Sequence, residues 1–433
     1  MSMTTGVAVL GVPVDFILFG TTLLGVALFH HHTLKVALIG LAVIALFKLL
    51  WGDFSGVAGL AGLGQLLAHE WVTLANLLGL LLGFALLADH FEKSRIPAIL
   101  PDYLPDDWKG GFVMLVLVFV ISSFLDNIAA AMIGGSMAAV LYQRRVHIGF
   151  LAAIVAASNA GGAGSVVGDT TTTMLWIGGV KPLQVFEAYI AAVPALLIFG
   201  IIAARQQHAY QPIMKDSPQG THIHWARLCI VAVILLSAVL ANVTFNLTQP
   251  QVLADWPVIG MTVWGAIAIT TPWRKPNWAL LPDALRGSVF LLALVLCAAM
   301  MPVQHLPPAS WPSALGLGFV SAVFDNIPLT ALALRQGGYD WGFLAYAVGF
   351  GGSMVWFGSS AGVALSGMYP EAKSVGAWLK GGWHVALAYV VGFGVLLAVL
   401  GWHPDAYIQQ ASSPAPNTPD LIAVPAHPSS TTR

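Results

Sequence analysis

Three aspartates lie within otherwise apolar stretches of this sequence: Asp126, Asp169 and Asp325. An ionised carboxylate at the centre of a bilayer costs about 2.5–3.5 kcal/mol on insertion scales, so such a residue usually faces a partner or a water-filled cavity. Carboxylates that cluster in a medium of low dielectric can hold either a proton or a metal cation. We therefore expect Asp169, together with Asp126 and Asn159, to form a titratable cation site. The alternative is that the aspartates cap helices or face water at the tips of hairpins.

Glycines and small polar residues interrupt two further apolar stretches. The first interruption runs from Ser158 to Ser165, and the second from Gly351 to Gly362. A broken helix at membrane depth is tolerated only where its backbone is buried in protein or lines a cavity, and its freed carbonyl and amide groups can bind ions. The alternative is close helix packing through small residues. We predict a broken helix at each interruption.

The candidate site residues come from these segments. The predicted ion- or substrate-binding residues are Asp126, Asn127, Ser158, Asn159, Asp169, Thr170, Thr171, Asp325, Asn326, Ser359 and Ser360. We expect Asp126, Asn159 and Asp169 to hold Na+. We predict no catalytic residues and no cofactor, with Na+ and H+ as transported or coupling ions. Asp15, Lys48, Glu187 and His384 also lie in or near apolar runs, and we expect structural roles for them.

The composition explains where these residues must lie. Hydrophobic residues make up 58% of the 433-residue chain and charged residues only 9%, whereas soluble proteins carry about 25% charged residues. The chain is therefore predicted to be a polytopic membrane protein with the lipid bilayer as its partner, and a soluble enzyme is excluded. The net charge of −1 gives no reason to expect nucleic-acid binding. The first apolar run follows no basic segment and is expected to be a retained helix.

The apolar runs follow the same order in each half of the chain. Each half is predicted to contain three helices, a re-entrant hairpin with Asp-Asn at its tip, a broken helix and a final helix. The runs are 7–29, 34–50, 71–88, 111–142, 147–180 and 183–204 in the first half, and 225–246, 256–271, 283–301, 312–336, 341–368 and 376–402 in the second.

The repeat is also visible in the residues themselves. Asp325-Asn326 lies 199 residues after Asp126-Asn127, and both pairs are followed by isoleucine. If each hairpin enters the membrane and returns, each half crosses five times, and the second half is inverted relative to the first. Inverted repeats with interrupted helices are typical of secondary transporters. The predicted fold class is an all-α polytopic membrane protein built from two inverted repeats.

The distribution of positive charge predicts the orientation. With both termini outside, 14 of the 18 Lys and Arg residues fall on the inner side. Cytoplasmic loops carry an excess of Lys and Arg, so this orientation is favoured. The predicted organisation is scaffold helices at 1–110, hairpin, broken and closing helices at 111–204, a cytoplasmic linker at 205–224, second scaffold helices at 225–311, second hairpin, broken and closing helices at 312–402, and a disordered tail at 403–433.

These motifs resemble those of the NhaD-type Na+/H+ antiporters of the ion transporter superfamily, which also holds citrate and arsenite carriers. The resemblance rests on Ser158-Asn159-Ala160-Gly161-Gly162, on Gly168-Asp169 with the four threonines that follow, on Gly358 to Leu365, and on both Asp-Asn pairs. It implies a homodimer with a scaffold domain and a mobile transport domain. It also implies two hairpins that meet two broken helices around a central site and move like an elevator.

The functional hypotheses follow from the residues and the resemblance together. The first is exchange of Na+ or Li+ for H+, in a bacterial inner membrane. The second is coupled transport of citrate, another organic anion or arsenite, although Ala160 stands where dicarboxylate carriers have threonine in a Ser-Asn-Thr motif. A gated channel and an intramembrane aspartyl protease are the hypotheses from other classes. The protease is disfavoured because Gly168-Asp169 lacks the first glycine of a Gly-x-Gly-Asp motif.

Overall fold

The computed structural model describes residues 8–9, 11–29, 32–54, 56–99, 104–214 and 222–404. Helices dominate this part of the chain, and a short antiparallel hairpin, β1 (Ala8–Val9) and β2 (Val12–Pro13), precedes them. The predicted tail lies outside the described residues from position 405 onwards, as do residues 215–221 of the predicted linker.

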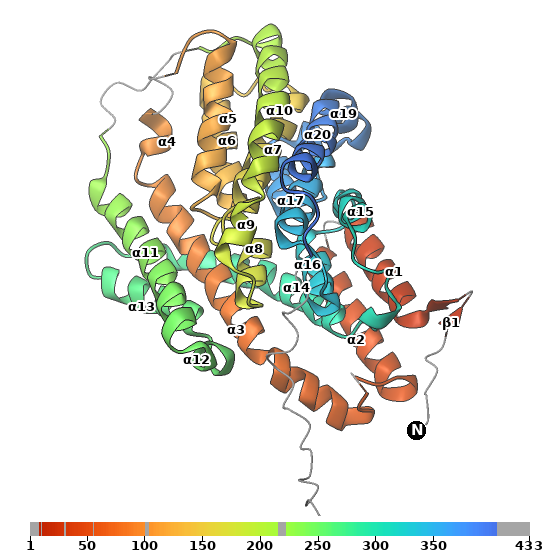
Figure 1. The fold of residues 1–433 in the computed structure, drawn as a ribbon. Coiled ribbons are helices and arrows are strands. Elements are labelled where there is room, and N and C mark those ends of the chain that lie inside the picture. Colours follow the sequence, from red (N-terminus) through yellow and green to blue (C-terminus); the bar gives the residue numbers. More distant parts are fainter. Residues whose placement is uncertain are drawn as a thin grey trace, which may run out of the picture.

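Helices follow one another throughout both halves of the described chain. The first half contains α1 (Val14–Leu28), α2 (Thr33–Trp51), α3 (Gly59–Glu92), α4 (Ile96–Ile99), α5 (Trp108–Ser122), α6 (Asn127–Leu141), α7 (Ile148–Ala163), α8 (Thr170–Ile177), α9 (Pro182–Phe186) and α10 (Tyr189–Tyr210). In Figure 1, α5, α6, α7 and α10 stand together in the upper part of the molecule, and α3 runs obliquely below them.

The second half contains α11 (Trp225–Thr248), α12 (Pro250–Asp255), α13 (Val258–Thr270), η3 (Trp278–Leu280), α14 (Leu281–Ala299), η4 (Val303–His305), α15 (Trp311–Ser321), α16 (Asn326–Gln336), α17 (Trp341–Gly351), η5 (Gly352–Met354), α18 (Ser360–Met368), η6 (Pro370–Lys373), α19 (Val375–Gly381) and α20 (Trp383–Leu400). Contacts between helices join the two halves extensively, for example between α10 and α20 and between α3 and α13.

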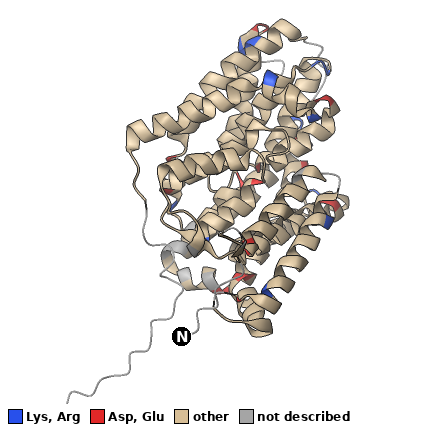
Figure 2. Ribbon diagram, turned by 90° about the vertical axis from the view of Figure 1, so that its right-hand side faces the viewer, with Lys and Arg blue, Asp and Glu red and all other residues tan. Residues whose placement is uncertain are grey.

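Several helices have the length and composition of membrane spans. Within the described residues these are Thr33–Trp51, Gly59–Glu92, Pro182–Tyr210, Trp278–Ala299 and Trp383–Leu400. Large apolar side chains are exposed on the outer surface, as expected where lipid covers a protein. Figure 2 shows long uncharged stretches of helix, with Lys and Arg mainly near helix ends. The chain is an all-α, multi-pass membrane protein, as predicted.

The two Asp-Asn segments form helical hairpins. Asp126 separates α5 from α6, and Asp325 separates α15 from α16. The two helices of the first hairpin have 15 residues each, and those of the second have 11. At 1.5 Å per residue these helices are about 22 and 16 Å long, which is too short to cross a hydrocarbon core of about 30 Å. The lengths suit segments that enter the membrane and return, while the inverted relation of the two halves stays a prediction.

The first helix break lies later in the chain than predicted. The segment Ser158–Ser165 is predicted to be irregular, but α7 continues through Ala163, and the irregular residues run from Gly164 to Asp169. Small residues do not break a helix that is buried on all sides, because its backbone groups are already paired. The second break fits better, since α17 ends at Gly351 and α18 begins at Ser360. Helix α3 is also longer than the predicted run 71–88, because it extends from Gly59 to Glu92.

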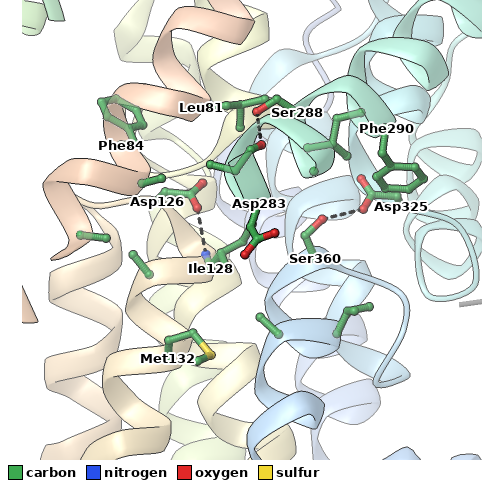
Figure 3. Close-up of a pocket in the computed structure, with 18 of the residues that line it drawn as sticks. Leu81, Phe84, Asp126, Ile128, Met132, Asp283, Ser288, Phe290, Asp325 and Ser360 are labelled. Atoms are coloured by element: carbon green, nitrogen blue, oxygen red, sulfur yellow. Dashed lines mark hydrogen bonds between the residues drawn. The ribbon is translucent and has the colours of Figure 1, made fainter. Parts of the chain in front are cut away.

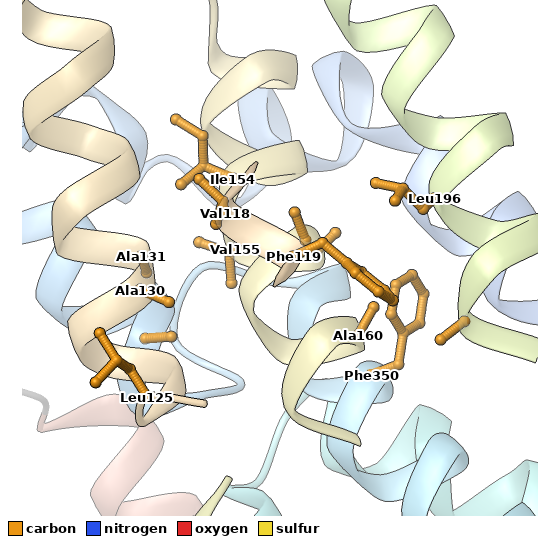
Figure 4. Close-up of a cluster of buried hydrophobic side chains, with 14 of the residues drawn as sticks. Val118, Phe119, Leu125, Ala130, Ala131, Ile154, Val155, Ala160, Leu196 and Phe350 are labelled. Atoms are coloured by element: carbon orange, nitrogen blue, oxygen red, sulfur yellow. The ribbon is translucent and has the colours of Figure 1, made fainter. Parts of the chain in front are cut away.

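Helix α7 forms the centre of the larger hydrophobic core. Its residues from Gly149 to Ala163 are all buried, and most are alanine, glycine or aliphatic residues. Figure 4 shows Ile154, Val155 and Ala160 of this helix beside Phe119. A helix that is apolar on every side is buried on every side, so α7 is the element around which the hairpins and closing helices pack.

A glycine of α7 tests this packing. We expect Gly161→Ala to lower the free energy of unfolding by about 1–3 kcal/mol, the usual range for overpacking. The added methyl would lie 2.1 Å from the carbonyl oxygen of Phe119, which as a backbone atom cannot rotate away. Thermal unfolding in detergent measures the effect. Gly394→Ala in α20 is the control, because its methyl would meet nothing within 4 Å; equal midpoints for the two variants would contradict the prediction.

Candidate functional site

Four helices begin near the centre of the molecule, and the residue before each one caps it. Asp126 Oδ2 accepts a hydrogen bond from the amide of Ile128 in α6 at 3.2 Å. Asp169 and Asp325 cap α8 and α16 in the same way, at 3.2 and 3.0 Å. Ser359 Oγ accepts from an amide of α18 at 3.3 Å. One oxygen of each aspartate therefore has the capping role that was the alternative interpretation.

The second oxygen of each aspartate contacts a side chain from another segment. Thr170 Oγ1 lies 3.5 Å from Asp126 Oδ1, and Ser360 Oγ donates to Asp325 Oδ2 at 2.9 Å. Asn326 Nδ2 donates to Asp169 Oδ2 at 3.3 Å. Capping leaves each carboxylate with one oxygen that points away from its own helix, and all three of these oxygens have hydroxyl or amide partners.

Asn159 provides the remaining connection, from the last turns of α7. Its Oδ1 accepts from Asn127 Nδ2 at 3.0 Å, and its Nδ2 lies 2.9 Å from Ser353 Oγ and 3.1 Å from Ser359 Oγ. Asn159 is fully buried. It thus joins the first hairpin to the second broken helix, two segments that are far apart in the sequence.

Together these contacts form a closed ring, which we call the capping ring. The four helix starts contribute the consecutive pairs Asp126-Asn127, Asp169-Thr170, Asp325-Asn326 and Ser359-Ser360, and Asn159 bridges one pair of them. Nine of the eleven candidate residues lie in this ring or contribute its bridge. The Ser158 hydroxyl instead donates to Val155 O within α7, and Thr171 is buried one position into α8.

A cavity of about 820 Å³ reaches the capping ring from one side. Asp126, Asp325 and Ser360 line it, whereas Asp169 and Asn159 lie behind its wall and are almost inaccessible. Figure 3 shows Asp126 and Asp325 on opposite sides of this space, with Asp283 between them. Helices α1, α2, α3 and α14 form one wall, and α6, α18 and the turn that ends at Asp325 form the other. Two of the three carboxylates are therefore accessible from this cavity.

The cavity wall is acidic. Asp89, Glu92 and Asp283 line it in addition to the two ring aspartates, and none of its lining residues is Lys or Arg. Asp89 pairs with Lys93 at 2.7 Å, and Asp283 pairs with Arg286 at 3.1 Å. These two pairs reduce the negative charge, and the charge that remains on the lining comes from Glu92 and the two ring aspartates, which favours cations over anions in the cavity.

Sequence reasoning did not identify the acidic lining residues or Ser353. Asp89 and Glu92 lie just beyond the predicted apolar run 71–88, and in the structure they belong to the last turn of helix α3. Asp283 was included in the run 283–301 without being singled out. Ser353 lies within the predicted interruption Gly351–Gly362, and this position could have indicated that it belongs to the site. Which helices form the cavity depends on tertiary packing, and the sequence pattern does not contain that information.

The expected Na+ ligands are close to one another in the network but are not joined directly. Asp126 contacts Thr170, Asn159 contacts Ser359, and Asp169 contacts Asn326. Among the described residues there is no group of three or more His, Cys, Asp or Glu side chains that could hold a metal ion. A monovalent cation at the ring would therefore need amide, hydroxyl or backbone oxygens together with the carboxylates.

The weaker candidates have structural partners. Asp15 Oδ1 lies 3.6 Å from Lys48 Nζ, and both side chains are nearly buried. Lys48 also donates to the carbonyl of Asp53. His384 Nε2 lies 3.2 Å from Gln206 Oε1 in a buried position between α20 and α10. A buried ion pair and a buried histidine with an amide partner fit the structural roles expected for these residues.

No family model matches the chain. Curated proteins do match it. Sodium/proton antiporter 1 of Arabidopsis thaliana is 26% identical over 359 residues, which cover 74% of this chain and 59% of that protein. The Na(+)/H(+) antiporters NhaD of Alkalimonas amylolytica and Vibrio cholerae are 26% and 25% identical over 343 and 385 residues, which cover 67% and 76% of this chain and 68% and 79% of those proteins.

This chain resembles the NhaD-type Na+/H+ antiporters. The comparisons thus agree with the resemblance carried by the two breaks and the two Asp-Asn pairs. The chain spans less than two thirds of the length of the first Arabidopsis relative. Identities of 24–27% support a resemblance to this type of antiporter, but they do not assign a role to any single residue.

The bridging asparagine gives a stability prediction. We expect Asn159→Ala to lower the free energy of unfolding by about 1–3 kcal/mol, because it leaves the buried amide of Asn127 and the hydroxyl of Ser353 without this partner. Thermal unfolding in detergent measures it. Asn277→Ala is the control, because Asn277 makes only a 3.5 Å contact with Asp89 in a half-buried position. A control variant that is as unstable as Asn159→Ala would argue against the bridge.

Proposed function

We propose that this protein is a secondary transporter that exchanges Na+ or Li+ for H+ across the membrane. The observation that carries the proposal is the capping ring, in which carboxylates cap three of the four helix starts and two of these carboxylates line the adjoining cavity. The relatives named as Na+/H+ antiporters support the same activity, which is transport and not enzymatic catalysis.

The charge of the ring favours a cation over an anion. Each helix N-terminus contributes about +0.5 elementary charge, so four of them contribute about +2. Three ionised aspartates contribute −3, which leaves a deficit of about one positive charge that one monovalent cation or one proton would supply. None of the described residues that line the adjoining cavity is Lys or Arg. Citrate or another organic anion would meet net negative charge here, so that hypothesis is disfavoured.

Exchange follows if the two ions cannot occupy the ring together. A proton neutralises a carboxylate and removes the ligand that the metal cation needs, while a bound metal cation favours the ionised carboxylate. Asp126 and Asp325 border the cavity and are the first to meet an entering ion, and Asp169 receives it in the interior. Asn159, Ser359 and the neighbouring hydroxyls would complete the oxygen ligands, as the expected Na+ site requires.

Alternating access is proposed to be of the elevator type. The cavity separates α1, α2, α3 and α14, which belong to the scaffold segments 1–110 and 225–311, from α6, α18 and the turn before α16, which carry residues of the ring. Movement of the ring-bearing segments 111–204 and 312–402 along this boundary would close the cavity and open the ring to the other side. We infer a homodimer in a bacterial inner membrane with both termini outside, as the resemblance and the charge distribution imply.

Substitution of the interior aspartate tests the proposed activity. In inside-out vesicles with an imposed proton gradient, we expect NaCl or LiCl to collapse the gradient with a steep dependence on pH, and Asp169→Asn to abolish this response because the neutral amide cannot exchange a proton for a cation. A pH-sensitive dye reports the gradient. Asp255→Asn is the matched control, since Asp255 is exposed on α12. Saturable citrate uptake without a cation response would refute the proposal.

Access to the ring can be tested separately from exchange. In a variant lacking Cys229 and Cys297, we expect a cysteine introduced by Val363→Cys to react with a membrane-impermeant maleimide from the cytoplasmic side, because Val363 is 40% exposed and lines the cavity. Conditions that drive turnover should slow labelling from that side. Leu240→Cys, 63% exposed on α11 outside the cavity, is the control. Equal reactivity at both positions under all conditions would contradict elevator-type closure.

A further inference from the structure

A second cavity lies away from the capping ring, and its lining is cationic. It has a volume of about 860 Å³ and is lined by Arg144, Arg145, His147, Gln206, Glu371 and Lys380 among others. Three positive side chains thus face one negative side chain around this space. None of the three makes an ion pair with another described residue.

The loop that carries the two arginines is fixed in place. Gln143 and Arg144 have φ values of +47° and +62°, a left-handed conformation that side chains rarely adopt. Gln207 of α10 is fully buried and makes two hydrogen bonds to the backbone of this loop. Its Nε2 donates to Arg145 O at 3.1 Å, and its Oε1 accepts from His147 N at 2.7 Å. The arginines therefore extend from a rigid backbone, so little order has to be gained when a ligand binds.

The start of α7 adds to the positive potential of this cavity. His147 is the residue before α7, and its Nδ1 accepts from the amide of Gly149 at 3.1 Å. That bond leaves Nε2 of the neutral ring as the atom that bears hydrogen. The helix dipole, two guanidinium groups and one ammonium group thus converge on one space, a combination suited to the oxygens of a phosphate group.

The surroundings of the cavity favour a lipid as the source of that phosphate. The cavity lies at the end of α10, which has the length and composition of a membrane span. Tyr210, which lines the cavity, is 51% exposed, and Leu379 and Trp383, which are close in sequence to the lining residues Lys380 and Gly381, are 48% and 50% exposed. Aromatic residues gather at the level of lipid headgroups, and basic pockets between membrane helices bind acidic headgroups. A phospholipid could thus place its phosphate in the cavity and its acyl chains along these side chains.

We propose that this cavity, lined by Arg144, Arg145 and Lys380 at the ends of α6, α10 and α19, is a binding site for the phosphate headgroup of an anionic phospholipid. The site is separate from the capping ring, and its occupancy does not depend on which ion the protein transports. By the predicted orientation it faces the inner leaflet, because the arginines belong to the positively charged inner side.

Native mass spectrometry of the full chain with cardiolipin, phosphatidylglycerol or phosphatidylcholine tests the proposal. We expect bound cardiolipin and phosphatidylglycerol but not phosphatidylcholine. The triple variant R144A/R145A/K380A should bind the anionic lipids roughly fivefold more weakly for each charge removed. The matched control is R95A/R274A/K275A, which removes the same charge from exposed positions that do not line the cavity.

Further measurements separate the possible outcomes. The charge-conserving variant R144K/R145K should keep most of the lipid binding, which distinguishes lost charge from lost folding. Equal lipid binding by the two triple variants would overturn the site. Saturable binding of inorganic phosphate that anionic lipids do not displace would overturn the assignment to a lipid.

Discussion

Backbone amides at the start of a helix have no water to bind inside a bilayer, and this constraint governs the arrangement of the centre of this protein. Four helices, α6, α8, α16 and α18, begin there, and each is capped by the side chain that directly precedes it. Three of the four caps are aspartates. The residues that satisfy the interrupted backbone therefore also bring the negative charge, and the proposed cation site would be a consequence of how the broken helices begin.

Close backbone contacts allow the broken helices to turn within so little space. A Cβ atom on Gly162 would lie 2.7 Å from the carbonyl oxygen of Gly168, and one on Gly352 would lie 2.7 Å from that of Gly358. The two breaks thus have the same local geometry, and each brings the end of one half-helix against the start of the next. Small-residue packing, the alternative interpretation of these stretches, is what holds the caps at the ring, so packing and site formation depend on the same glycines.

The sequence predicted the all-α membrane fold and singled out most residues of the capping ring, but it did not predict the residues that surround the ring. Asp126, Asp169 and Asp325 could be identified because placing a carboxylate in an apolar membrane segment costs free energy, so such a residue usually has a partner or a function. The break near Ser158 was placed too early, because small residues are compatible with a helix such as α7 once it is buried on all sides. Asp89, Glu92 and Asp283 could not be identified, since they line the cavity only through the packing of α3 and α14 against the hairpins.

The two halves of the ring have similar backbones but different charge. Asp169 has φ −145° and ψ 144°, and Ser359 has φ −141° and ψ 153°, so both residues cap a half-helix from an extended conformation. Aspartate at both positions would give four carboxylates against four helix starts worth about +0.5 each, a deficit of about two charges. Serine at position 359 satisfies the same backbone without that charge. The deficit falls to about one, which is the charge of a single Na+ or a single proton, and this matches a site where one monovalent ion replaces another.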